Sequence, residues 1–170
     1  MAKAYIGLDV HKEVIAIGIA FEGQDEAISH GKCSSDLERL LTAMRRMLKK
    51  YGLTKHDVRV CYEAGPCGFA LARHLLRIGY KLDVVAPSLI PVRSGDKVKT
   101  DKRDARKLAR LLRAGELTAV HVPDEADEVI RDLCRARTDA VTDQTRNRHR
   151  LGSFKQRRPP LLYCGFFRRP

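Results

Sequence analysis

The sequence predicts an α/β domain with a mixed sheet flanked by helices, followed by a polar helix that projects from the domain. Three observations lead to this fold class. Apolar residues near the N-terminus run or alternate as they do in consecutive strands joined by short turns. Helical and strand-like segments then alternate, which is typical of α/β proteins. Beyond Asp124 the pattern is helical but its apolar stripe thins, so this helix needs a partner.

The first elements are expected to be strands. Over residues 4–21 the chain is either continuously apolar or alternates between apolar and polar residues. The pattern resumes over residues 26–31, after the turn-like Gly23-Gln24-Asp25. Glycine and aspartate are frequent in turns because they tolerate or stabilise the backbone conformations that turns require. We therefore expect three consecutive strands at the start of the chain.

A helix is expected next, because Ser35 and Glu38 have the spacing of a capping box. In such a box the Ser35 hydroxyl bonds the backbone N–H of Glu38, and Glu38 reaches back. Apolar residues recur at helical spacing over residues 37–48, and Gly52 can end the helix. Strands and helices then alternate, over residues 58–62 (strand), 66–79 (helix), 82–86 (strand), 101–114 (helix), 117–122 (strand) and 124–150 (helix).

Composition divides the chain into three parts, residues 1–123, 124–153 and 154–170. The first is the α/β domain, and the second is the polar helix, a possible coiled-coil segment. The third is an irregular basic tail, rich in arginine, proline and aromatic residues but without periodicity. Lysine and arginine number 33 against 21 acidic residues, a net charge of +12 that favours a polyanionic partner.

Several classes of protein do not fit this sequence. The longest uncharged apolar stretch, Val14 to Phe21, is far shorter than the roughly 20 residues that span a bilayer. No secretory signal is present at the N-terminus, so we expect a cytoplasmic protein with no membrane partner. The five cysteines are widely spaced and include no C-x-x-C pair, which argues against a disulfide framework and a zinc site.

Four acidic residues are candidates for a functional site. Asp9 interrupts the first apolar strand and shares a face with Gly7, a neighbour small enough to let something approach closely. Glu63 directly follows an apolar strand, at the kind of strand end where ligands bind in α/β sheets. Asp101 and Asp104 form a D-x-x-D pair at a helix start, so both project from one face.

Each of these acids also has an ordinary structural explanation. Asp9 can open a turn, Glu63 can be an exposed loop residue, and acids in a first helical turn complement the helix macrodipole. A good helix start alone does not require the cations that surround the helical pair. We expect six of them to contact nucleic-acid phosphates: Lys97, Lys99, Lys102, Arg103, Arg106 and Lys107.

Convergence of the four carboxylates would require a cation, because their mutual repulsion otherwise raises their pKa values. Mg²⁺ or Mn²⁺ would serve, since both take hard oxygen ligands. Two such ions about 4 Å apart can clamp the attacking and leaving oxygens of a phosphoryl transfer. The sequence thus predicts a divalent-metal site beside a phosphate-binding surface.

Three motifs occur in order along the chain: Ile6-Gly7-Leu8-Asp9-Val10-His11-Lys12, Tyr62-Glu63-Ala64-Gly65-Pro66 and Lys99-Thr100-Asp101-Lys102-Arg103-Asp104-Ala105. Together they resemble the DEDD-type transposases of bacterial insertion sequences, a group that includes the Piv pilin-gene invertases and the bridge-RNA-guided recombinases. The resemblance covers residues 4–153 approximately. It implies a RuvC-like, RNase H-type domain in which Asp9, Glu63, Asp101 and Asp104 are the catalytic, metal-binding tetrad.

The resemblance also implies an activity and its partners. The family are DNA transposases and recombinases that cleave and transfer strands with a divalent metal, some of them with a structured guide RNA. The passage at Val122-Pro123-Asp124 resembles the family's entry into its coiled-coil segment. We expect a homo-oligomer through the helix after Asp124, because its apolar stripe is too thin for a lone helix. Family members continue into a second domain that supplies a serine nucleophile, and the sequence after Phe154 departs from the family. We therefore expect a truncated chain that keeps the metal site but lacks the complete recombination site.

Three other functions share parts of this pattern. An autonomous Mg²⁺-dependent nuclease of the Holliday-junction-resolvase type would nick DNA with the tetrad alone. A non-catalytic nucleic-acid-binding remnant would bind with a steep salt dependence and without cleavage. A sugar kinase or actin-like ATPase also begins with an Asp-bearing strand, but its first turn needs Gly, Ser or Thr, where this chain has Val10-His11-Lys12-Glu13.

Overall fold

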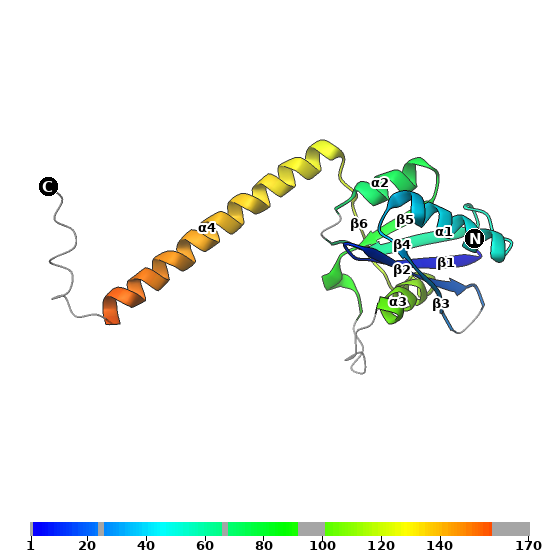
Figure 1. Ribbon diagram of the computed structural model, residues 1–170, viewed down its shortest axis with the longest axis horizontal. Helices are drawn as coiled ribbons and strands as arrows, with labels where there is room; N and C mark the ends of the chain where they lie inside the picture. The colour runs from blue at the N-terminus through cyan, green and yellow to red at the C-terminus, as the bar shows by residue number, and fades with distance from the viewer. Residues whose placement is uncertain (1, 24–25, 66–67, 92–100, 158–170) are drawn as a thin grey trace. The chain divides into compact units, whose positions relative to one another are not determined.

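The computed structural model describes residues 2–23, 26–65, 68–91 and 101–157, apart from the side chains of residues 101 and 102 (Figure 1). The chain forms two compact units, Met1–Val122 and Pro123–Pro170. Each unit is described by itself below.

The first unit is built on a six-stranded mixed sheet (Figure 1). β1 pairs antiparallel with β2 and parallel with β4, β5 continues the parallel pairing, and β6 is antiparallel to β5. β2 runs apolar without alternation because residues 15–20 are buried under helices on both faces. In spatial order the strands are β3 (Ile28–Ser34), β2 (Val14–Phe21), β1 (Ala4–Val10), β4 (Val58–Glu63), β5 (Lys81–Val85) and β6 (Ala119–Val120).

Helices cover both faces of this sheet. α1 (Leu37–Lys50) and α2 (Ala70–Arg77) lie on one face, and α3 (Asp101–Ala114) lies on the other (Figure 1). The larger core cluster joins Leu8 of β1 to Met44 of α1 and Leu75 of α2, all fully buried. On the opposite face Cys61 of β4 packs against Leu108 of α3, and its thiol lies 3.6 Å from the Leu108 carbonyl oxygen. A short 3₁₀ helix, η1 (Pro87–Leu89), follows β5.

α3 lies directly on β1 and β2 because both strands present a glycine to it. A Cβ added at Gly7 would lie 2.6 Å from the Ala109 nitrogen, and one added at Gly18 would lie 2.7 Å from the Arg106 nitrogen. Real Cβ atoms do not approach backbone that closely. Gly7 and Gly18 are paired across the β1–β2 hairpin, so together they form a flat surface on which the helix lies, here called the glycine seat. The close approach predicted beside Asp9 is therefore made by α3.

The second unit contains α4 (Glu125–Arg157), a helix of 33 residues with no buried residue. Its start is capped by Asp124, whose Oδ1 accepts a hydrogen bond from the Asp127 N–H at 2.8 Å. In the described part of the chain, neither this helix nor any other is long and apolar enough to cross a membrane.

The expected α/β class with a mixed sheet is confirmed, and the differences lie at element ends. The capping box is wrong: Asp36 caps α1 by accepting from the Arg39 N–H at 3.0 Å, while the Ser35 hydroxyl donates to the Lys12 carbonyl at 2.7 Å. The third strand begins at Ile28, two residues later than expected. α2 begins at Ala70 and α4 continues to Arg157.

The length of α4 has a local cause. Lys155, Gln156 and Arg157 are good helix formers, and the first residue that cannot continue a helix is Pro159. The polar helix therefore passes the expected boundary at residue 153.

Candidate metal and nucleic-acid site

Asp9 and Glu63 lie on neighbouring parallel strands at the same end of the sheet. The last paired residues of β1 and β4 are Leu8 and Tyr62, so Asp9 and Glu63 occupy the next position on each strand. Because side chains alternate across a strand, Glu63 faces the same side as Cys61, which packs under α3. Asp9 faces that side too, since it is two residues after the glycine on which α3 lies.

α3 runs antiparallel to β1, which brings its first turn to that same end. Near the C-terminus of α3, Arg113 donates from Nη1 to the Phe21 carbonyl at 3.0 Å, beside the amino end of β1. Ala105 lies over Gly7, nearer the carboxyl end. The turn that carries the Asp101–Asp104 pair precedes Ala105 and so continues toward the carboxyl ends of β1 and β4.

The three described carboxylates differ in exposure. The side chain of Asp9 is 14% exposed, and its Oδ2 lies 3.1 Å from Nε2 of His11, whose side chain is 53% exposed. Asp104 is half-buried and Glu63 is exposed. Asp9 is therefore held by a hydrogen bond in a partly enclosed position, while Glu63 reaches solvent.

The donor chemistry of the site fits a hard divalent cation, because all four candidate ligands are carboxylates. Among the described side chains, no three His, Cys, Asp or Glu residues lie close enough together to hold a metal ion. The side chain of Asp101, the fourth candidate, lies outside the described residues. The structure thus brings the strand ends of Asp9 and Glu63 and the first turn of α3 to one end of the sheet, but it does not gather the described carboxylates around one point.

The candidate phosphate-binding residues divide into three groups. Lys97, Lys99 and the side chain of Lys102 lie outside the described residues. Arg103 is exposed on α3 and Lys107 is half-buried. Arg106 donates from Nε to the Ala27 carbonyl at 2.7 Å, so its guanidinium fixes α3 to the segment before β3.

A carboxylate in the middle of this sheet face is already matched by a cation. Asp83 Oδ2 lies 2.6 Å from Arg59 Nε, and hydrogen bonding to Asp83 raises the pKa of the Arg59 guanidinium. The face under α3 thus carries an ion pair on β4 and β5, with the Arg59 side chain 50% exposed, and the acidic candidates at its carboxyl edge.

Sequence reasoning missed two groups that position the site. Gly18 seats α3 together with Gly7. Arg106 and Arg113 bind α3 to two backbone carbonyls, one just before β3 and one at the end of β2. A glycine inside an apolar strand signals a close backbone approach, so Gly18 could have been found by that rule. The arginine contacts span 79 and 92 residues of sequence and carry no local signal.

A family profile and two curated relatives identify the family of this chain. The profile of a DEDD transposase family of the IS110 type, described as a transposase, matches residues 6–155. The putative transposase y4qE of Sinorhizobium fredii is 45% identical over 152 residues, which are 89% of this chain and 38% of that protein. The transposase for insertion sequence element IS1533 of Leptospira borgpetersenii is 38% identical over 157 residues, 92% of this chain and 44% of that protein.

This chain therefore spans less than half the length of these curated relatives. Among solved structures, RuvC of Thermus thermophilus is similar with a TM-score of 0.43 and 14% sequence identity, over 69% of this chain and 99% of that chain.

Proposed function

This chain belongs to the family of DEDD transposases of the IS110 type, and we propose that it forms the metal-dependent nuclease domain of an insertion-sequence transposase. The domain would cleave DNA strands, and the whole protein would transfer them. One observation supports this proposal above the others. Asp9 and Glu63 follow adjacent parallel strands, and α3 begins with its acidic pair at the same end of the sheet.

In this proposal Mg²⁺ or Mn²⁺ is held by the carboxylates of Asp9, Glu63, Asp101 and Asp104. A bound divalent ion supplies Lewis-acid stabilisation of charge on the phosphate oxygens. His11 orients the Asp9 carboxylate through the hydrogen bond to Oδ2, as second-layer groups commonly do at metal sites. The basic residues around the start of α3 attract the phosphate backbone toward the acids.

We propose DNA as the substrate and a structured guide RNA as a further partner, both polyanions that suit a chain of net charge +12. We expect the protein to act in the cytoplasm, where the DNA of a bacterial insertion element is found. The serine-dependent steps of recombination are proposed for the whole protein, since this chain matches less than half of each curated relative.

Calorimetric titration with Mn²⁺ tests the metal site. The full chain should bind Mn²⁺, and the Asp9→Asn and Asp104→Asn variants should each lose most of that binding. Both variants should fold with little loss of stability, because removing one acid relieves repulsion at the unliganded site. Asp132→Asn on α4 is the matched control, and its affinity should equal that of the wild type. Unchanged affinity in both site variants would contradict the proposal.

A nucleic-acid-binding role without catalysis is the second candidate, and the basic composition alone favours it. Incubation with supercoiled plasmid and a four-way DNA junction in Mn²⁺ separates the two. Cleavage by the wild-type chain and not by Asp9→Asn would support the nuclease, and cleavage confined to the junction would indicate a resolvase-like enzyme. Binding that weakens steeply with salt and never cuts would indicate the binding role.

A further inference from the structure

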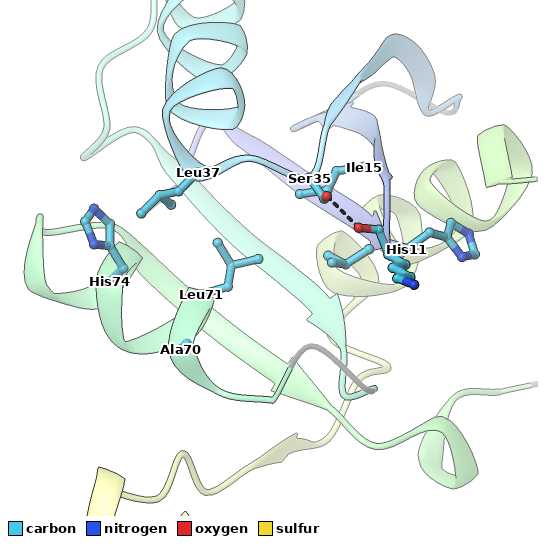
Figure 2. A pocket seen from close by; sticks show the side chains of 9 residues that line it. His11, Ile15, Ser35, Leu37, Ala70, Leu71 and His74 are labelled. Carbon is cyan, nitrogen blue, oxygen red and sulfur yellow. Dashed lines mark hydrogen bonds between the residues drawn. The ribbon is translucent and has the colours of Figure 1, made fainter.

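A pocket of about 780 Å³ opens at the carboxyl end of β1, on the face that α1 and α2 cover (Figure 2). Its apolar walls come from four elements. Val10 and Ile15 lie in the β1–β2 hairpin, Leu37 begins α1, and Leu71 lies on α2. The volume of this pocket is within the range of roughly 300–1,000 Å³ that is usual for pockets that bind small molecules.

Polar groups stand at the two ends of this pocket. In Figure 2 His74 and His11 lie at opposite ends, with Leu37 and Leu71 between them, and the ring of His11 points away from these leucines. Lys12, next to His11, adds a cationic side chain to the lining. Apolar walls with a few hydrogen-bonding groups and a cation at one end suit a ligand that has a flat ring and a phosphate.

The pocket and the acidic edge share one side chain. His11 lines the pocket and, through Nε2, lies 3.1 Å from Oδ2 of Asp9, which faces the opposite side of the sheet. The turn that carries His11 is fixed to the start of α1, because the Ser35 hydroxyl donates to the Lys12 carbonyl at 2.7 Å (Figure 2). A ligand phosphate at Lys12 would therefore lie at the rim next to Asp9.

We propose that this pocket receives one unpaired base of a DNA strand whose backbone passes the acidic end of the sheet. The inference rests on the proposed function and names a specificity element for it. The ring packs between Leu37 and Leu71, the imidazole of His74 bonds a base edge, and Lys12 pairs with the adjoining phosphate. A base that is already unpaired enters without the cost of unstacking a duplex, a few kcal/mol per base.

Equilibrium binding of two DNA duplexes to the full 170-residue chain tests this proposal. One duplex carries a single bulged 2-aminopurine, and the other has the same 2-aminopurine paired with thymine. EDTA is present, so that no metal chemistry contributes. The chain should bind the bulged duplex about tenfold more tightly, since contacts to one base contribute on the order of 1–3 kcal/mol. The 2-aminopurine fluorescence should change on binding in the bulged duplex alone.

Ala70 provides a way to fill the pocket without touching the core. It is an exposed lining residue at the start of α2, so Ala70→Trp should remove the preference for the bulged duplex and leave binding of the paired duplex unchanged. Leu76→Trp is the matched control, because Leu76 is 42% exposed on the same helix and does not line the pocket. His74→Ala is a second variant that cannot overfill the site, and it should reduce the preference several-fold.

The outcomes separate the pocket from the proposed function. Equal binding of both duplexes by the wild-type chain, or a preference that survives in both Ala70→Trp and His74→Ala, would overturn the pocket proposal alone. Failure to bind either duplex would overturn the proposed function with it. Circular dichroism of each variant checks that the fold is kept.

Discussion

Gly7 and Gly18 determine where the acidic pair of α3 lies relative to Asp9. Backbone atoms of α3 occupy the space that a side chain at either glycine would need. A larger residue would push α3 away from β1 and β2, and the turn that carries Asp101 and Asp104 would move with it. Two residues that bind nothing themselves therefore control the distance between the two halves of the proposed metal site.

Gly7→Ala should destabilise the first unit by about 1–3 kcal/mol, the usual cost of overpacking a core contact. It should also weaken Mn²⁺ binding, because the first turn of α3 moves away from Asp9. Urea unfolding and calorimetric titration measure the two effects. Gly65→Ala is the control for stability, since its added Cβ would meet its nearest atom, the Glu63 carbonyl oxygen, at an ordinary 3.9 Å. Wild-type stability in Gly7→Ala would show that α3 does not lie on the glycine seat.

Asp57 makes the stability of the first unit depend on pH in acid. Hydrogen bonds from the Thr54 hydroxyl at 2.7 Å and the Thr54 N–H at 2.9 Å, together with Lys3 at 2.9 Å, hold the pKa of Asp57 well below its usual value. A depressed folded-state pKa stabilises the fold above the unfolded value, about 3.9, and this contribution is lost as the pH falls through the folded pKa.

Asp57→Asn should therefore be less stable than the wild type at pH 7, and the difference should shrink steadily below about pH 4. Urea unfolding of both proteins between pH 7 and pH 2.5 gives the two curves. Asp132→Asn on α4 should run parallel to the wild type. A difference between Asp57→Asn and wild type that stays constant over this range would show that the ion pair and hydrogen bonds do not act in solution.

At the level of elements, periodicity in the sequence is enough to find each strand and helix but not to fix their ends. Ser35 and Asp36 are both good capping residues, and the sequence alone favours Ser35 because Glu38 follows three positions later. Asp36 caps the helix instead, because the Ser35 hydroxyl donates to the backbone carbonyl of Lys12, which is 23 residues away in the chain. The same limit applies to the site. Strand alternation and the D-x-x-D spacing indicate which acids belong together. The position of α3 on its two glycines and the pocket could not be predicted, because both depend on contacts between segments that are distant in the sequence.

The contribution of each candidate capping residue to stability can be measured. Asp36→Ala should destabilise the first unit by about 1 kcal/mol, because the Arg39 N–H loses its acceptor. Glu38→Ala should cost less than half of that, since Asp36 and not the Ser35–Glu38 pair caps the helix. Thermal or urea unfolding of the two variants measures both losses of stability. Equal losses of stability in the two variants would support the capping box instead.

At the scale of the whole molecule, positive charge and apolar exposure are concentrated after the sheet domain. From Arg146 onward the chain contains eight lysine and arginine residues and no acid, so the charge of residues 1–145 is 25 − 21 = +4. Four apolar residues in the first half of α4 are about half exposed or more: Val129, Ile130, Leu133 and Val141. The basic residues suit a nucleic acid, whereas the apolar ones suit another protein surface.

A second copy of α4 is the partner that its apolar stripe predicts. A helix of 33 residues is about 50 Å long, and one with no buried residue gains no stability from a core. Pairing two copies would bury Ile130 and Leu133, which lie on one face at a spacing of three residues. The molar mass in solution should therefore rise with protein concentration toward that of a dimer. Leu133→Asp should return the monomer without changing the unfolding of the sheet domain, whereas Arg135→Ala, on the other side of the helix, should still dimerise. Light scattering after size-exclusion chromatography and sedimentation equilibrium measure this mass, and a monomer mass that does not change with concentration would refute the pairing.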